Sequence, residues 1–296
     1  MKKYKPYLTR VDLVKNQVER ERIQEQEAKR KRKQRIQEQN RQNHLRYQEQ
    51  LRSEMAARYF HSVISAGGDS VFNKYSLALD GTDDFVTFGN MSNFSGATQF
   101  TFSGWYNFNS VPARESIFSI LVDNNNFFDI LMYDALTYVQ LKIGGVTQMI
   151  RFNSSLFTQG QWSHIVVAYD NTQSTNRTKL KVYIDNVDIY YGVITAITSA
   201  LPTGTNVVTI GETSRLSGVF LNGNADECAV FNTQLSASDI TSIYNSGVPN
   251  DISSLNPLSW WRCGDNDTAP TLTDNGSASN DGTMTNFTTF STDVPT

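Results

Sequence analysis

Two segments near the middle of the chain alternate between apolar and polar side chains with a period of two. They cover residues 162–170 (WSHIVVAYD) and 179–186 (KLKVYIDN). The second segment divides into two sides, with Leu180, Val182 and Ile184 on one and Lys179, Lys181 and Tyr183 on the other. This period, with β-branched and aromatic residues, is typical of a strand buried on one face only. Because residues 170–176 between the segments are rich in turn formers, the pair predicts a β-hairpin.

Further short alternating segments follow the same pattern and are separated by turns rich in Gly, Asn and Asp. They cover residues 75–80, 85–88, 100–108, 117–122, 127–132, 138–143, 149–152, 189–194, 207–210, 227–231 and 258–263. Many short strands with such turns are typical of a β-sandwich or jelly roll. The sequence therefore predicts a mainly β domain, an antiparallel sandwich, over residues 74–296, with 258–296 as its closing C-terminal segment.

One short helix is expected inside this domain, at residues 235–245. Ser236 is its predicted N-cap, and Asp239 takes the third helical position. This arrangement is a capping box with Asp in place of the usual Glu.

The first sixty residues have a different composition. Residues 11–60 contain neither Pro nor Gly and are dominated by Glu, Gln, Arg and Lys, which are good helix formers. We expect an extended N-terminal arm over residues 1–10, a long helix over 11–60 and a linker over 61–73, where two glycines break the helix.

One side of this helix carries apolar residues near both ends but polar residues in the middle. The residues we expect to carry assembly or anchoring are Val11, Val14, Val18, Lys31, Arg32, Lys33, Ile36, Tyr47, Leu51 and Met55. A stable two-stranded coiled coil needs apolar positions sustained over three or four heptads, which this side of the helix lacks. The helix is therefore expected to be ordered when it packs on other proteins; coiled-coil association, including a trimer, stays open.

Charge is distributed unevenly along the chain. Residues 1–60 hold 17 Lys/Arg and 8 Asp/Glu, a net of +9, whereas the remainder holds 9 basic and 21 acidic residues, a net of −12. A basic arm on an acidic body implies separate partners for the two parts. The basic cluster at residues 29–35 favours protein contact or solvent over nucleic acid.

Two cysteines, Cys228 and Cys263, are too few for a disulfide framework, and we expect both to be reduced and buried rather than paired. No apolar run approaches the ~20 residues of a membrane helix. The basic N-terminus is not followed by an apolar segment, so neither membrane insertion nor a secretory signal is expected.

Six motifs in order carry a resemblance to a known family. They are residues 76–86 (SLALDGTDDFV), 100–105 (FTFSGW), 161–169 (QWSHIVVAY), 181–186 (KVYIDN), 210–211 (IG) and 223–227 (GNADE). The chain resembles the laminin-G-like, concanavalin A-like lectin superfamily over roughly residues 75–247. It departs from the family at Asp185-Asn186, where Asp-Gly is usual. Since Asn tolerates positive φ, a similar turn is expected.

The C-terminal segment adds a second resemblance. Residues 260–265 (WWRCGD) with 274–275 and 280–286 are similar to a Trp-containing strand and Asp/Gly-rich turn that precede the body in many family members. Here they follow it. This variant resembles structural proteins of tailed bacteriophages, which implies a virion location for a protein made in the host cytoplasm.

The resemblance also implies Ca²⁺ binding at a rim, through carboxylates and carbonyls. The metal candidates are Asp80, Asp83, Asp84, Asp226 and Glu227. The alternative is that the first three hold their own turn and that the last two hold the preceding loop through backbone N–H groups.

Aromatic side chains in alternating strands usually belong to the core. This is our expectation for the four tryptophans, Trp105, Trp162, Trp260 and Trp261, over sugar stacking. Because neighbouring residues of a strand point to opposite faces, one of Trp260 and Trp261 must leave the main core. His164 is expected to be structural rather than a base.

Catalysis is not expected. The glucanases of the superfamily carry a Glu-x-Asp-x-x-Glu pattern on one strand, and the sequence has none. The chain is thus predicted to be a non-enzymatic virion structural protein that contacts other virion proteins through residues 1–60 and displays a lectin-like domain, with surface glycans as its candidate ligands. The alternative is a free Ca²⁺-dependent carbohydrate-binding module.

Overall fold

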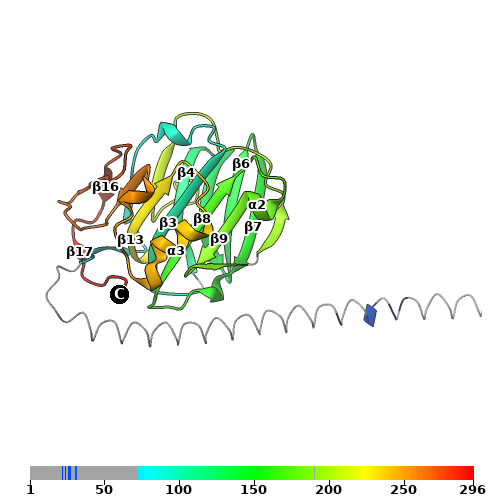
Figure 1. Cartoon of the computed structure of the whole chain (residues 1–296), viewed down its shortest axis with the longest axis horizontal. Helices are drawn as coiled ribbons and strands as arrows, with labels where there is room; N and C mark the ends of the chain where they lie inside the picture. The colour runs from blue at the N-terminus through cyan, green and yellow to red at the C-terminus, as the bar shows by residue number, and fades with distance from the viewer. Residues whose placement is uncertain are drawn as a thin grey trace, which may run out of the picture. The chain divides into compact units, whose positions relative to one another are not determined.

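The computed structural model describes residues 72–111, 113–189 and 191–296, and residues 22, 24, 26, 27 and 31 of the N-terminal part (Figure 1). The chain divides into two compact units, residues 1–69 and 70–296. The five described N-terminal residues, Lys31 among them, are helical and exposed. The predicted arm, the rest of the predicted helix and all the other anchor residues lie outside the described residues.

Two antiparallel sheets form the body of the second unit. The first, sheet A, contains β10 (Val187–Asp188), β9 (Leu180–Ile184), β8 (Trp162–Asp170), β3 (Gln99–Phe108), β13 (Asn222–Phe231), β1 (Ser76–Asp80) and β17 (Phe290–Ser291) in spatial order, and β14 (Ser259–Trp261) also pairs with β13. The second, sheet B, contains β11 (Gly192–Thr195), β7 (Val146–Asn153), β6 (Leu136–Ile143), β5 (Asn126–Asp134), β4 (Ala113–Asp123), β12 (Val207–Ile210), β2 (Phe85–Thr87), β16 (Gly282–Thr285) and β15 (Thr271–Leu272).

Helices are short in this unit. They are α2 (Asn176–Lys179), α3 (Ala237–Tyr244) and the 3-10 turns η1 (Ser92–Phe94), η2 (Ser154–Leu156), η3 (Asn245–Gly247) and η4 (Ser253–Leu255). The prediction of a mainly β antiparallel sandwich is confirmed.

The predicted central hairpin is present as β8 and β9. Val167 lies opposite Val182 in an antiparallel register. The connection contains one helical turn, α2, which the sequence interpretation treated as a plain turn; Thr175 caps it with a capping box. The turn after β9 has positive φ at both Asp185 (49°) and Asn186 (64°), as a type I′ hairpin turn requires.

One predicted strand, residues 189–194, is confirmed only in its second half, which lies in β11. Ile189 ends the pairing in sheet A beyond β10, and the chain joins sheet B only at β11. Ile189 and Tyr191 are nevertheless buried. Ile189 and Tyr191 therefore belong to a crossover between the two sheets, which buries side chains outside any strand, and pairing resumes at Gly192.

The main core lies between the two sheets and contains Leu180, Val182 and Ile184. A second apolar cluster lies on the outer side of sheet A, where α3 crosses β3, β8 and β9 in Figure 1. Tyr183, from the predicted polar side of β9, belongs to this cluster and is only 5% exposed. The expectation that this strand is buried on one face only is therefore wrong, because a helix sixty residues further along covers its other face.

The capping box predicted for α3 is confirmed. Ser236 is the N-cap and accepts the backbone N–H of Asp239, while the Asp239 side chain accepts the N–H of Ser236. Asn245 ends the helix in the left-handed conformation. The cap fixes where the helix begins, and its apolar residues Ile240 and Ile243 then face sheet A.

The C-terminal segment contributes strands to both sheets. β14 pairs with β13 and β17 with β1 in sheet A, while β16 pairs with β2 in sheet B. Cys228 and Cys263 are both free and buried, as expected.

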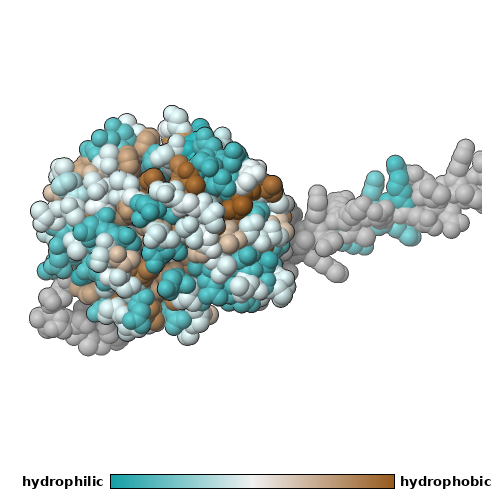
Figure 2. Space-filling view, turned by 90° about the horizontal axis from the view of Figure 1, so that it is seen from above, coloured by the Kyte–Doolittle hydropathy of each residue, from teal (hydrophilic) through white to brown (hydrophobic). Residues whose placement is uncertain are grey.

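The surface is mainly polar. Figure 2 shows small hydrophobic areas set among hydrophilic residues on the face turned to the viewer. The large apolar side chains exposed among the described residues come from separate elements: Tyr75, Tyr133, Val146, Val193, Val207 and Val248. No helix in the described part of the chain is both long and apolar enough to cross a membrane.

Candidate functional site

The turn between β1 and β2 brings three of the predicted metal ligands together. One carboxylate oxygen from each of Asp80, Asp83 and Asp84 lies within 4.8 Å of the others. Asp80 and Asp83 are exposed, whereas Asp84 is buried. Burial raises the pKa of Asp84, the N–H of Asp80 lowers it, and the neighbouring charges of Asp80 and Asp83 raise it further.

The turn itself already uses two of these carboxylates. Asp80 Oδ1 accepts the N–H of Thr82 at 2.7 Å, and Asp84 Oδ2 accepts the N–H of Asp80 at 3.1 Å. Oxygen ligands of this kind suit Ca²⁺, which takes six to eight of them, so three carboxylates supply part of such a shell. The local hydrogen bonds also account for the arrangement as a stabilised turn.

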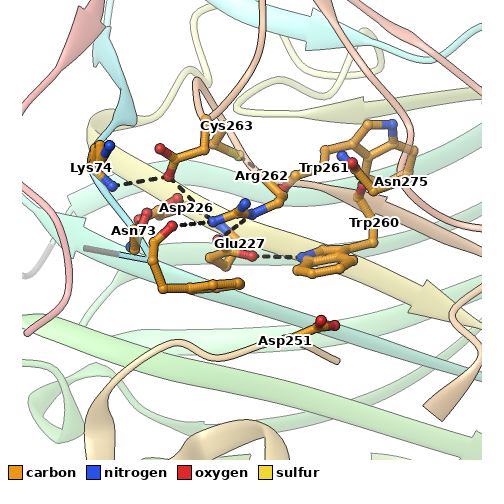
Figure 3. Close-up of polar contacts among 12 residues, drawn as sticks. Asn73, Lys74, Asp226, Glu227, Asp251, Trp260, Trp261, Arg262, Cys263 and Asn275 are labelled. Atoms are coloured by element: carbon orange, nitrogen blue, oxygen red, sulfur yellow. Dashed lines mark hydrogen bonds and ion pairs between the residues drawn. The ribbon is translucent and has the colours of Figure 1, made fainter. Parts of the chain in front are cut away.

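The other two predicted metal ligands, Asp226 and Glu227, lie elsewhere, in the interior of sheet A (Figure 3). They occupy an irregularity of β13, where the register with β3 shifts and Glu227 has φ 44°. Asp226 Oδ1 accepts the N–H of Glu227 at 2.8 Å and its Oδ2 accepts the amide of Asn73 at 2.7 Å. Only one of these two bonds comes from a backbone N–H. The alternative expectation, that the two carboxylates hold the preceding loop through backbone N–H groups, therefore describes only a small part of the arrangement.

Arg262 completes this buried network. Its Nε donates to Glu227 Oε1 at 3.1 Å, and the indole Nε1 of Trp260 donates to Glu227 Oε2 at 2.6 Å. The guanidinium also donates to the carbonyl of Phe72 and lies 3.6 Å from Asp265. Its Cζ stands 4.0 Å from the ring centre of Phe72. All four carboxylate oxygens of Asp226 and Glu227 thus have protein partners, and the network joins the start of the domain to β13 and β14.

Burial dominates the electrostatics of this network. It raises the pKa of Glu227 to about 7 against the opposing effect of Arg262, and it raises the pKa of Asp226, with the charge of Glu227 adding to the effect. Since a buried charge requires a partner, Arg262 is the residue that allows Glu227 to ionise.

Three tryptophans, Trp105, Trp260 and Trp261, and His164 are buried, whereas Trp162, also expected in the core, is half-buried and donates from Nε1 to Asp293 at 3.1 Å. Trp261 belongs to the main core and Trp260 to the second cluster, as their opposite directions predicted. Nε2 of His164 lies 2.8 Å from the hydroxyl of Ser103, and its ring packs on Trp105. Burial lowers the pKa of His164 to about 3. The imidazole is therefore neutral, and its Nδ1 has no hydrogen-bond partner among the described residues.

The outer face of sheet B is partly covered. Arg215, from the loop after β12, donates from Nε to the buried carboxylate of Asp129 at 3.0 Å, and its Cζ lies 4.1 Å from the ring centre of Phe127. Ser119 donates to the same carboxylate at 2.6 Å. Burial raises the pKa of Asp129, and Arg215 opposes this effect. This half of the face is closed by its own side chains.

The other half of the outer face of sheet B is open. In register across four strands, Arg114 of β4 faces Tyr133 of β5, and Tyr138 of β6 faces Arg151 of β7. Tyr133 is 41% exposed, and both arginines are exposed. The guanidinium of Arg114 lies 5.0 Å from the ring centre of Tyr133. We call these four residues the arginine–tyrosine row.

The two tyrosines of the row are diagonal neighbours. Tyr133 pairs with Leu136, and Tyr138 follows two residues later on the same face of β6. Diagonal pairs lie within reach of aromatic side chains. Beside Arg151 the edge strand β11 contributes Gly192, which has no side chain to cover the guanidinium. The row is thus a surface of aromatic rings and cations.

Sequence reasoning did not find this row. Alternation within β6 and β7 points Tyr138 and Arg151 to one side, which is a signal in the sequence. Their proximity to Arg114 depends on the pairing of β4 with β5 and β5 with β6, and no local pattern contains that information.

Together these features define a lectin-like sandwich with a covered face and an open face. The model of the concanavalin A-like lectin/glucanases superfamily matches residues 80–241. Since this is more than half of the chain, the protein belongs to that superfamily. No curated protein matches the chain.

Several solved structures are similar. A proposed carbohydrate-binding protein from Bacteroides ovatus is 14% identical, with a TM-score of 0.51 over 75% of this chain and 61% of that one. Domain 4 of the arabinanase AbnA from Geobacillus stearothermophilus, in complex with arabinotriose, is 17% identical, with a TM-score of 0.45 over 61% of this chain and 84% of that one. The sialidase CBM40 of Ruminococcus gnavus, bound to α2,3-sialyllactose, is 15% identical, with a TM-score of 0.44 over 59% and 99%. At these identities the likeness is one of fold.

Proposed function

We propose that this protein is a non-enzymatic virion structural protein whose sandwich domain binds carbohydrate on the open face of sheet B. The observation that carries the binding proposal is the difference between the outer faces of the two sheets. On the outer side of sheet A, α3 covers an apolar cluster, whereas sheet B presents the arginine–tyrosine row, in which Arg114, Tyr133 and Arg151 are exposed and Tyr138 is half-buried. Aromatic rings stack on sugars through their apolar faces, and polar groups beside them fix the orientation.

A glycan array probed with the full chain tests this proposal. Wild-type protein is expected to bind at least one glycan, and Tyr133→Ala is expected to weaken that binding by about tenfold, since stacking contributes ~1 kcal/mol or more. Val207→Ala, at another exposed apolar position on the same sheet, is the matched control. Absence of binding to every glycan would remove the carbohydrate proposal.

The virion role rests on different observations. It is supported by the resemblance of the C-terminal variant to phage structural proteins and by the contrast between a basic first part and an acidic body. In this proposal residues 1–60 bind other virion proteins or further copies of the chain, a trimer included, and the domain is displayed outward. The protein is made in the host cytoplasm and resides in the virion.

Deletion of residues 1–60 tests the anchor. The truncated protein is expected to fold, with an unchanged near-UV spectrum, and to be missing from assembled particles. Normal incorporation of the truncated protein would show that these residues are not the anchor.

The second candidate function is a free Ca²⁺-dependent carbohydrate-binding module. It is favoured by the three carboxylates of Asp80, Asp83 and Asp84, whose oxygens lie within 4.8 Å. For this candidate, millimolar Ca²⁺ is expected to raise the melting temperature and the glycan affinity together, and Asp83→Asn to abolish both effects. A melting temperature and a glycan profile unchanged by Ca²⁺ and by EDTA would exclude it.

A further inference from the structure

Five arginines lie in the sandwich domain, and three of them have carboxylate partners. Arg177 pairs with Asp188, Arg215 with Asp129, and Arg262 with Glu227 and Asp265. For the other two, Arg114 and Arg151, no carboxylate of the described residues lies within salt-bridge distance. These are the two arginines of the arginine–tyrosine row.

Both arginines lack an ionic partner although the domain is acidic, and they share this with its lysines, for which no ion pair occurs among the described residues. Residues 61–296 carry a net charge of −12, so carboxylates are abundant in the domain. The acidic residue next to Arg114, Glu115, points to the opposite face of β4 and is only 3% exposed. Asp134, next to Tyr133, is exposed but forms no ion pair with Arg114. Both guanidinium groups of the row are therefore exposed, with Tyr133 as the aromatic contact of Arg114, and neither has a carboxylate partner among the described residues.

The chemistry of the row defines the class of that ligand. A guanidinium presents parallel N–H donors that match a carboxylate in a bidentate pair. The rings of Tyr133 and Tyr138, between the two arginines, present an apolar surface with hydroxyl groups at its edge. An acidic sugar has both complementary parts, a planar anion and an apolar ring face.

Spacing indicates a ligand longer than a single sugar. Arg114 and Arg151 stand on β4 and β7, three strand spacings apart, which amounts to ~14 Å at ~4.8 Å each. Both can engage one ligand only if it carries charges on separate units. A densely charged polymer such as nucleic acid is disfavoured by the overall negative charge of the domain, which repels it before contact.

We propose that the open face of sheet B binds an acidic oligosaccharide, with its carboxylates on Arg114 and Arg151 and its rings on Tyr133 and Tyr138. This inference rests on the proposed carbohydrate-binding function and names the chemical class of its ligand. It does not depend on Ca²⁺, because the turn carboxylates belong to another part of the fold.

The test uses the full chain and a panel of uronic-acid and sialic-acid oligosaccharides, each paired with its carboxyl-reduced neutral form. Binding is measured by calorimetry at low and high salt. At least one acidic member is expected to bind tenfold or more tightly than its neutral partner, and salt is expected to weaken it because exposed charges are screened. Arg114→Met and Arg151→Met are each expected to lower its affinity by about tenfold.

Two kinds of control keep the result specific. Lys181→Met on sheet A removes the same charge from the domain and is expected to leave the affinity unchanged. Arg114→Lys retains the charge but not the fork of donors, so it is expected to restore only part of the affinity. Thermal melting of each variant shows that the domain is folded.

Four results would overturn the inference. If neutral forms bind as tightly as acidic ones, the ligand class is wrong while the carbohydrate function stands. If the double variant R114M/R151M binds the acidic forms like wild type, the arginine–tyrosine row is not their binding site. If an acidic peptide or a DNA oligonucleotide binds the row and no acidic glycan does, the surface recognises another polyanion. If no glycan of either kind binds, the inference and the proposed function fail together.

Discussion

The outer faces of the two sheets differ in what covers them. On sheet A, α3 buries Tyr183, and the closing segment places Arg262 over the carboxylate of Glu227. On sheet B, Arg114 and Arg151 are exposed, the first beside the exposed Tyr133 and the second beside the half-buried Tyr138. The same residue type therefore has two roles: a buried arginine stabilises a carboxylate that the fold has removed from water, whereas an exposed arginine is available to a ligand.

This difference has an energetic consequence. Removing one partner of a buried ion pair leaves an uncompensated charge, whereas removing an exposed charge affects the fold little. Substitutions on the covered face of sheet A should accordingly lower the stability of the protein. Substitutions on the open face of sheet B should instead lower its affinity for the ligand.

The largest expected effect is at Arg262. Arg262→Met should destabilise the protein by ~3 kcal/mol, because Glu227 loses its cation while it stays buried. Arg114→Met should change stability by less than about 0.5 kcal/mol. Urea unfolding of both variants at pH 8 measures the contrast. Adding Glu227→Gln to Arg262→Met should recover part of the lost stability, since no buried charge remains. If Arg262→Met and Arg114→Met lowered stability equally, the proposed difference between the two faces would be contradicted.

The next effect concerns pH. Burial raises the pKa of Glu115 to about 8 and that of Glu227 to about 7. A carboxyl group with a raised pKa in the folded state stabilises the fold while it is protonated, and this stability is lost as pH rises from ~4.5 through the folded value. The lowered pKa of His164 acts oppositely, but only below its unfolded value of ~6.5. Stability should therefore fall by ~1 kcal/mol per pH unit between pH 6.5 and 8.

Glu115→Gln isolates the contribution of Glu115, because no cation of the described residues pairs with this carboxyl group and would be orphaned by the substitution. Its stability should fall less steeply than that of wild type between pH 7 and 8, with the remaining slope due to Glu227, and its stability at pH 8 should exceed that of wild type. Chemical unfolding at half-unit pH steps gives the profile. A wild-type profile that rises from pH 6.5 to 8 would contradict the assignment.

The smallest effect concerns the helix that covers sheet A. Ser236→Ala removes the cap of α3 and should cost ~1 kcal/mol, which thermal melting detects. Ser242→Ala on the exposed side of the same helix should change stability by less than about 0.5 kcal/mol. If the cap variant also weakened glycan binding, the two faces would be coupled and the comparison would need revision.

Local patterns in the sequence determined the elements of the sandwich. Period-two alternation gave the central hairpin, the Asp185-Asn186 turn followed from the tolerance of these residues for positive φ, and the capping box of α3 was visible in Ser236 and Asp239. These features depend on interactions within a few residues of the chain, so a single sequence contains the information for them. The family motifs are of the same kind, since each occupies one strand or turn.

Only the tertiary structure decided what lies on each strand face. Alternation separates Tyr183 from Val182 but does not reveal that α3 buries Tyr183 while the main core buries Val182. Arg262 meets Phe72 across 190 residues of sequence, and Arg114 shares a face with Arg151 only through three strand pairings. Whether a side chain becomes part of an interior network or of a binding surface depends on such long-range neighbours, because they determine its exposure to water.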